Sequence, residues 1–95
     1  MKIYKYPIGK MPGDYEISAP IVKLLGVHLD TTGQPCLYAV VEPDAEHKAE
    51  DDVIIHVFWT GQELPFLTPY WCYLSTLQIG KLIYHYFVSN RVTPV

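Results

Sequence analysis

The sequence predicts an all-β domain with about seven short antiparallel strands in a compact meander, sandwich or partly open barrel. Three observations lead to this fold class. No segment keeps a helical period over the ~11 residues that an amphipathic helix needs. Short apolar or alternating runs recur, and turns that contain Gly, Pro or Asp separate them. The 95 residues are enough for one domain, which we place at 1–95.

The first two expected strands lie before Pro20 and are short. Lys2–Tyr6 alternates, with its tyrosines on one side, and ends at Pro7 and the turn region Gly9–Gly13. Tyr15–Ser18 follows as a second strand. Because prolines flank it and cannot donate ladder hydrogen bonds, we expect this strand at a sheet edge.

A hairpin is expected next, with Ile21–Leu29 as its first strand. Strict alternation places Val22 and Leu24 on one face and the odd-numbered residues from Lys23 to Leu29 on the other. Gly26 suggests a bulge or a close backbone approach. The polar loop 30–34 is short enough to join this strand to an antiparallel partner, Cys36–Val41.

Two strands are expected to be central. Gly33–Pro43 contains a nearly continuous apolar run between turn residues, which is typical of a strand covered on both faces. Val53–Thr60 is also apolar on both faces. Trp71–Ile79 and Lys81–Val88 complete the fold as a hairpin that turns at Gly80.

The charges exclude some classes of function. Six of the ten acidic residues lie within Glu42–Asp52, and no basic stripe exists, so duplex nucleic-acid binding is not expected. No apolar run reaches the ~18 residues of a membrane helix, and the N-terminus has no secretory signal. We therefore expect a cytoplasmic protein in which Cys36 and Cys72 are reduced and buried.

No pattern of catalytic or metal-binding residues stands out. His56 and His85 lie in the middle of expected strands and could approach each other near Cys72 or Glu63, but no zinc-ligand spacing is present. We expect hydrogen-bonded histidines at the edge of the core. Cys36 lies in an apolar strand, which disfavours a nucleophilic role. The sequence predicts no enzyme, no metal and no cofactor.

Two loops hold the candidate binding residues. The acidic loop is either solvated or attracts a basic partner. Aromatic residues in and beside the loop 61–69 either plug an open end of the fold or contact a partner. The candidates are Trp59, Gln62, Phe66, Tyr70, Trp71, Glu46, Glu50, Asp51 and Asp52.

Tyrosines at period two suggest a surface for self-association. They occur in pairs in the first and last expected strands, Tyr4 with Tyr6 and Tyr84 with Tyr86. The excess of apolar residues has two explanations: a core covered on both sides, or apolar surface that is buried only in a homo-oligomer.

Several segments in order resemble a family of short proteins of unknown function from bacteriophage and prophage genomes. They are KIYKYP at 2–7, GQPCLYAVVEP at 33–43, TGQ at 60–62, YLSTLQ at 73–78 and LIYHYF at 82–87. The chain departs from the family pattern at Ser75, where Gly is usual, and at Glu63, where His often stands. The resemblance implies a phage-type, β-rich protein and assigns no catalytic residue.

The expected function is that of a non-enzymatic accessory or anti-host-defence protein in the host cytoplasm. It would bind and block a host protein through the acidic loop and the aromatic loop. One alternative is a homo-oligomer that binds a small nucleotide, with Trp59, Tyr70 or Trp71 stacking on a base and Lys81 or Arg91 near a phosphate. A second alternative is a minor structural protein of the virion.

Overall fold

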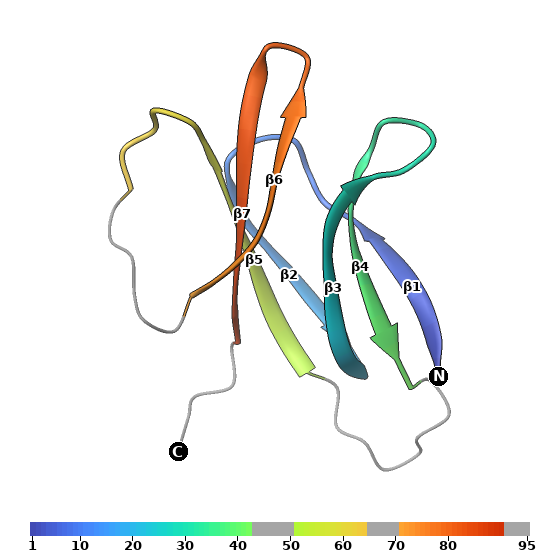
Figure 1. Ribbon diagram of the computed structural model, residues 1–95. Helices are drawn as coiled ribbons and strands as arrows, with labels where there is room; N and C mark the ends of the chain where they lie inside the picture. Colours follow the sequence, from blue (N-terminus) through green and yellow to red (C-terminus); the bar gives the residue numbers. More distant parts are fainter. Residues whose placement is uncertain (43–50, 65–70, 91–95) are drawn as a thin grey trace.

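The computed structural model describes residues 1–42, 51–64 and 71–90, which form two antiparallel sheets (Figure 1). The three-stranded sheet has the order β1-β4-β3, with β1 Lys2–Pro7, β4 Pro35–Val41 and β3 Ile21–Leu29. The four-stranded sheet has the order β2-β5-β7-β6, with β2 Gly13–Ala19, β5 Asp51–Trp59, β7 Leu82–Asn90 and β6 Cys72–Ile79. The predicted all-β fold is confirmed, and the sheets do not close into a barrel. The described residues contain no helix that could cross a membrane.

The predicted strand positions agree with the sheet order. β4 pairs with β1 on one side and β3 on the other, and β5 pairs with β2 and β7, so both apolar strands are central. β2 is an edge strand, as its flanking prolines predict. The β3–β4 and β6–β7 hairpins are also confirmed, with strand ends that differ from the predicted ones by up to two residues.

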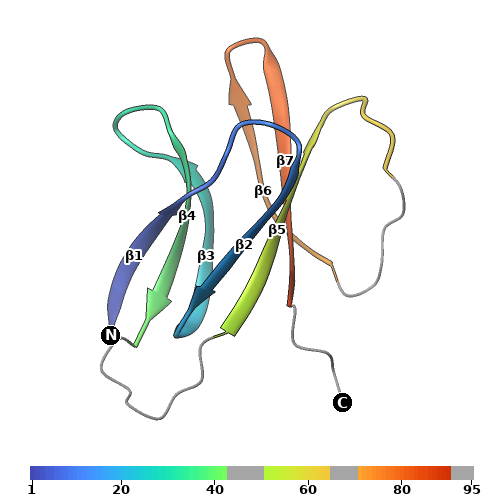
Figure 2. The same ribbon diagram turned by 180° about the vertical axis from the view of Figure 1, so that it is seen from behind.

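The chain passes from one sheet to the other between β1 and β2 (Figure 2). Ile8 begins this crossing and is buried, and its backbone N–H donates to the Pro35 carbonyl at 2.9 Å. The Tyr15 hydroxyl donates to the Met11 carbonyl at 2.8 Å. The Tyr15 ring occupies the space beside Gly9, where an added Cβ would lie 2.3 Å from the phenolic oxygen. A side chain at this position would displace the ring.

Asp30 organises the turn between β3 and β4. Its carboxylate accepts hydrogen bonds from the Thr32 N–H at 2.8 Å and the Gln34 N–H at 3.0 Å, and from the Thr32 hydroxyl at 2.6 Å. These donors, the Thr32 hydroxyl first, hold the pKa of Asp30 well below its usual range. Lys5 of β1 reaches the same carboxylate at 3.2 Å, so the turn is tied to the edge strand.

The predicted faces of β3 are wrong because the strand contains two irregularities. The register with β4 shifts between Ile21 and Lys23 and again between Leu24 and Gly26. Each shift adds an unpaired residue and reverses the alternation that follows it. The first shift therefore reverses the faces of Lys23 and Leu24, and the second restores the original alternation, so that Val27 is fully buried and Leu25 is exposed. The bulge predicted at Gly26 is confirmed by the second shift.

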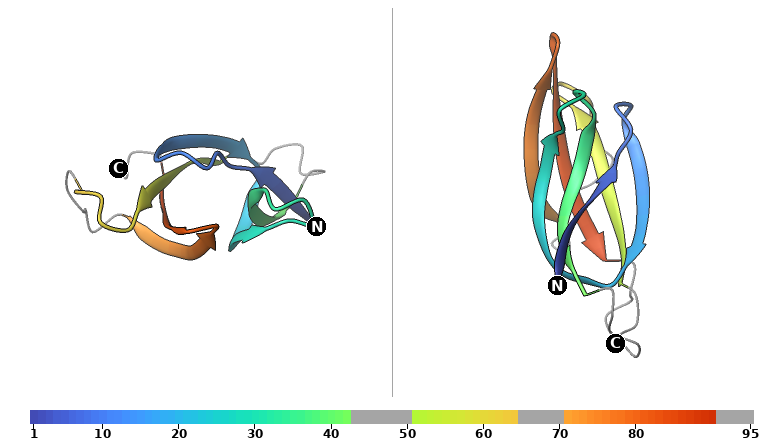
Figure 3. Two further views of the ribbon diagram at one scale, coloured as in Figure 1. Left: turned by 90° about the horizontal axis from the view of Figure 1, so that it is seen from above. Right: turned by 90° about the vertical axis from the view of Figure 1, so that its right-hand side faces the viewer.

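The two sheets meet along one margin, where β3 lies beside β6 (Figure 3). The buried Val27 N–H donates to Ser75 Oγ at 2.9 Å across this margin. An added Cβ on Gly26 would lie 3.2 Å from the same Ser75 oxygen, so the small residue leaves room for the Ser75 side chain. Ser75 thus satisfies a buried backbone donor of the edge strand β3.

The core fills the space between the inner faces of the two sheets. Its buried apolar residues are Ile8, Ala19, Ile21, Val27, Leu37, Ala39, Val41, Val53, Ile55, Val57, Tyr84, Tyr86 and Val88. Tyr84 and Tyr86 were expected on a surface for self-association, but they face inward from β7 and are 6% and 0% exposed. Tyr6 packs against the core from the edge strand, and Tyr4 is 41% exposed. The four tyrosines therefore form no common surface within one chain.

Candidate functional site

The outer face of the four-stranded sheet carries more apolar and aromatic surface than one solvated face requires. Antiparallel register places the residues opposite one another on this face. His56 lies between Asp14 of β2 and Phe87 of β7, and His85 of β7 lies between Phe58 and Thr76. Alternation directs the neighbouring residues Ile55, Val57 and Tyr86 into the core, so the two faces of β5 and β7 have separate roles.

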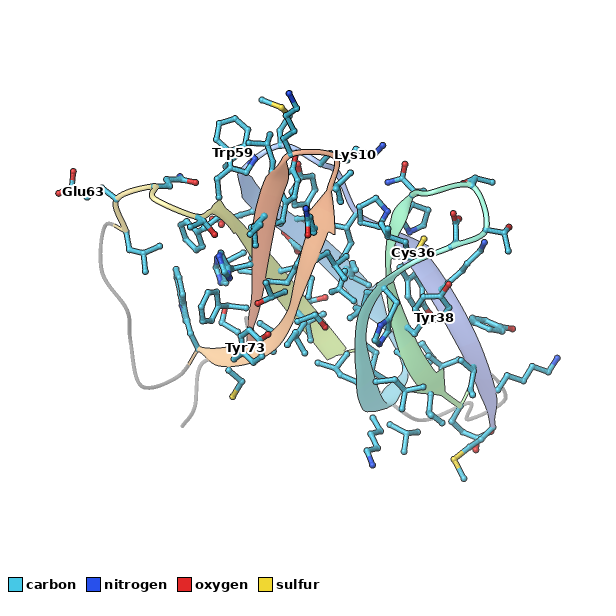
Figure 4. The ribbon with its side chains drawn as sticks, turned by 45° about the horizontal axis from the view of Figure 1, so that its top comes forward. Lys10, Cys36, Tyr38, Trp59, Glu63 and Tyr73 are labelled. Carbon is cyan, nitrogen blue, oxygen red and sulfur yellow. The ribbon has the colours of Figure 1, made fainter. Side chains whose placement is uncertain are left out.

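An aromatic cluster occupies the middle of the outer face. Trp71, which directly precedes β6, stacks on the His56 ring at a centroid distance of 3.9 Å and an angle of 12°. Phe87 meets Phe58 edge to face at 6.1 Å and Tyr73 at 6.0 Å. Tyr73 is 60% exposed. We call these five residues the aromatic cluster. Its rings lie on the side of the sheet that faces away from the core, and Tyr73 is the member labelled in Figure 4.

His56 is the buried member of this cluster and is hydrogen-bonded through both ring nitrogens. Its Nδ1 lies 2.8 Å from the Asp14 carboxylate, and its Nε2 lies 2.7 Å from Ser89 Oγ. The same order of acid, imidazole and hydroxyl activates the serine of acyl-transfer enzymes. Here the Asp14 side chain is 68% exposed and the imidazole lies against Trp71. The arrangement holds the ring flat and in place for stacking.

His85 joins a second hydrogen-bond chain, which runs from Tyr73 through Thr76 and His85 to Thr60. The Tyr73 hydroxyl lies 2.7 Å from Thr76 Oγ1, which lies 3.1 Å from His85 Nδ1, and His85 Nε2 lies 2.5 Å from Thr60 Oγ1. A neutral imidazole donates through one nitrogen and accepts through the other. The donors of this hydrogen-bond chain can therefore point in either direction. If His85 Nε2 donates to Thr60 Oγ1, the Thr60 hydroxyl can donate to another group; if Nε2 accepts, the Thr60 hydrogen is used on His85.

An open pocket of about 220 Å³ lies beside the aromatic cluster at the end of β5. It is lined by Phe58, Trp59, Thr60, Gly61, Gln62, Leu64, His85 and Phe87. The turn after β5 forms one wall, and the Trp59 N–H fixes it by donating to Gln62 Oε1 at 3.0 Å. Gly61 has a φ of 88°, which favours glycine in this turn.

Charge is divided between the two sheets. The strands of the four-stranded sheet contain Asp14, Glu16, Asp51 and Asp52 and no Lys or Arg. The strands of the three-stranded sheet contain Lys2, Lys5 and Lys23 and no Asp or Glu. Because the predicted acidic loop leads into β5, the acidic character of the four-stranded sheet continues that of the loop.

The structure places only some of the predicted binding residues. Phe66, Tyr70, Glu46 and Glu50 lie outside the described residues, as does Arg91. Trp71 lies on the outer face, where it stacks on His56, and Gln62 lines the pocket. Asp52 accepts a hydrogen bond from Ser18 on β2, and Asp51 begins β5.

The Trp59 side chain does not present its ring on the outer face. Alternation along β5 turns it to the inner side, where it packs edge to face against Tyr84 at 6.4 Å. Phe58 and Phe87 were not among the predicted binding residues, because the aromatic surface was expected in the loop. Strict alternation in β5, combined with a β5–β7 pairing, would have identified both.

The predicted state of the cysteines is half correct. Cys36 is fully buried, and burial raises the pKa of its thiol, as does the nearby Asp30 carboxylate. Cys72 is exposed, contrary to prediction, because it starts the edge strand β6. His56 and His85 share the outer face, yet each ring is engaged by hydroxyl or carboxylate partners. The described residues contain no group of three or more potential ligands that could hold a metal ion.

A family model described as "Domain of unknown function (DUF7352)" matches residues 1–94. No curated protein and no solved structure matches the chain.

Proposed function

The chain belongs to the DUF7352 family of domains of unknown function, and from this premise we propose that it is a non-enzymatic binding protein that acts by occupying a partner protein. The binding surface is the outer face of the four-stranded sheet. The resemblance of the sequence to short phage proteins supports a phage-type accessory role, in which the partner is a host protein in the host cytoplasm and binding blocks its activity.

One observation carries this proposal: the outer face combines exposed aromatic surface with acidic charge. Tyr73 is exposed, and Trp71 and Phe87 are partly exposed beside it. Aromatic residues contribute much of the energy in protein interfaces because they bury large areas with few rotatable bonds. A solvated sheet face needs no such cluster, since the core already lies on the other side.

The division of charge specifies the kind of partner. The acidic strands of the four-stranded sheet attract a basic surface and repel an acidic one, which accelerates association and selects among partners. Asp14 and Asp52 also keep their own hydrogen bonds to His56 and Ser18. The partner we propose is therefore a host protein with a basic, partly apolar surface.

A capture experiment with matched charge variants tests the proposal. Tagged wild-type protein, the double variant Asp14→Asn/Asp52→Asn and the double variant Lys2→Gln/Lys23→Gln would each be incubated with host lysate at low and physiological salt. Asn keeps an acceptor oxygen for His56 and Ser18, so the fold is preserved. We expect a basic host protein to be retained by wild type and the lysine variant and lost from the acidic-residue variant. Equal retention of every host protein by all three forms would refute the proposal.

Self-association stays a prediction that one measurement decides. Exposed apolar side chains remain on the three-stranded sheet, at Ile3 of β1 and at Val22 and Leu25 of the irregular strand β3. Light scattering of the pure protein would give its mass in solution. A dimer or tetramer would support the predicted homo-oligomer, and a monomer across the micromolar range would refute it.

A further inference from the structure

We propose that the open pocket beside β5 is a binding site for an uncharged planar heteroaromatic group, the chemistry of a nucleobase. The pocket is defined by its lining residues at the end of β5, in the following turn and on β7. The pocket shares Phe58 and Phe87 with the proposed protein-binding face, but the ligand proposed for it is of a different class. Its ligand is a small molecule that carries such a ring.

The volume of the pocket limits the size of the ligand. Pockets for complete drug-sized ligands usually measure roughly 300–1,000 Å³. The 220 Å³ found here is smaller, so one ring system enters and the rest of the ligand stays in solvent. Figure 4 shows Glu63 extending away from the sheet, so its carboxylate does not fill the pocket.

The described part of the lining offers no charged partner to a ligand. None of its eight described residues is Asp, Glu, Lys or Arg, and both ring nitrogens of His85 are engaged by threonine hydroxyls. A guanidinium, ammonium or phosphate that entered would lose hydration without gaining an ion pair, which is costly. A neutral ring loses little hydration and gains contact with Phe58, Phe87 and Leu64. A phosphate attached to the ring would remain outside.

The two phenylalanines give the pocket a corner suited to a flat ring. The Phe58 and Phe87 rings meet at an interplanar angle of 69°. A planar ligand that stacks on one ring therefore turns its edge toward the other, and aromatic rings attract each other in both arrangements. Base stacking on protein aromatics is favourable for every base, because each base has a π-face.

The polar groups supply what the edge of a base requires. Gln62 uses its Oε1 to accept from the Trp59 N–H, which leaves the amide NH₂ as a donor. The Thr60 hydroxyl presents either a hydrogen or a lone pair, according to the direction of the His85 hydrogen-bond chain. The pocket therefore fits a base whose edge carries one hydrogen-bond acceptor, for Gln62, and beside it either a donor or an acceptor, for Thr60.

Nuclear magnetic resonance with four nucleosides tests the site directly. Adenosine, guanosine, cytidine and uridine would each be titrated into the full chain, and the Thr60 and Leu64 methyl signals and the Gln62 side-chain amide would be followed. We expect at least one nucleoside to shift all three with a dissociation constant in the millimolar range or tighter, as for other fragment-sized ligands. Benzyl alcohol, whose ring edge carries no hydrogen-bonding atoms, should bind about tenfold more weakly.

Two variants locate the binding energy. Thr60→Val keeps the shape and removes the hydroxyl, and Phe87→Leu removes a ring wall; each should weaken binding about tenfold. Their matched controls lie away from the pocket, Thr31→Val in the turn between β3 and β4 and Tyr4→Leu on β1, and should leave the affinity unchanged. Circular dichroism checks the fold of each variant, and Thr60→Val alone decides the result if Phe87→Leu does not fold. The proposal is overturned if no nucleoside shifts the pocket signals, or if Thr60→Val binds as tightly as wild type.

Discussion

The hydroxyl of Tyr86 gives the sharpest test of how this core is built. Tyr86 is 0% exposed, and its hydroxyl has no hydrogen-bond partner among the described residues. A buried polar group without a partner loses its hydration at a cost of roughly 1–3 kcal/mol. Replacement by phenylalanine removes the hydroxyl and keeps the ring, so Tyr86→Phe should be about 1 kcal/mol more stable than wild type at pH 7.

The same substitution predicts a change in alkaline stability. Burial raises the pKa of Tyr86 from 10.0 to about 12. The protein therefore keeps its full stability below pH 10, where the phenol is neutral in both the folded and the unfolded chain. It loses stability as the pH rises toward 12, because only the unfolded chain ionises the phenol readily. From these two pKa values the loss is about 1.4 kcal/mol at pH 11 and approaches roughly 3 kcal/mol well above pH 12. Tyr86→Phe should lack this component.

Urea denaturation followed by circular dichroism at pH 7 and pH 11 measures both effects. Tyr4→Phe is the matched control, because Tyr4 is substantially exposed and should show neither effect. The reasoning fails if Tyr86→Phe is clearly less stable than wild type at pH 7, which would mean that the hydroxyl has a partner. It also fails if the variant loses as much stability between pH 7 and pH 11 as wild type does.

Two further predictions concern the margins of the sheets. Ser75→Ala should lower the free energy of unfolding by about 1–3 kcal/mol, because it leaves the buried Val27 N–H without an acceptor. The exchange rate of that amide hydrogen should rise. The control Gln78→Ala, at an exposed position of β6, should change the free energy of unfolding by less than about 0.5 kcal/mol. If both variants have equal urea midpoints, the Val27–Ser75 bond is not what joins the sheets. Asp30→Asn should lower the thermal midpoint at pH 7 and flatten the loss of stability below about pH 4. Because the pKa of Asp30 is lower in the fold than in the unfolded chain, its carboxylate stabilises the fold at pH values above the unfolded pKa. This stabilisation disappears as the carboxylate is protonated. An unchanged acid profile in a thermal melt series from pH 2 to pH 7 would contradict this role.

The sequence by itself determined which segments are strands and which of them are central. Continuous apolar runs in 35–41 and 53–59 require cover on both faces, and the prolines beside β2 prevent it from being an inner strand. These are local properties of side chains and backbone donors, so they can be recognised without knowing the partners. The turn at Asp30 and the bulge near Gly26 were predictable for the same reason.

Only the tertiary structure decided how the faces of the strands are used. Two register shifts in β3 reversed the expected faces of the residues between them, since one added residue moves the following side chains to the other side of the sheet until a second one restores the alternation. The β2-β5-β7 order brought Asp14, His56 and Ser89 together from three distant segments. The same order placed Phe58 beside Phe87, buried Tyr86 and divided the charges between the sheets. Pairing between strands is a long-range choice, and the periodicity of a single strand contains no record of its neighbours.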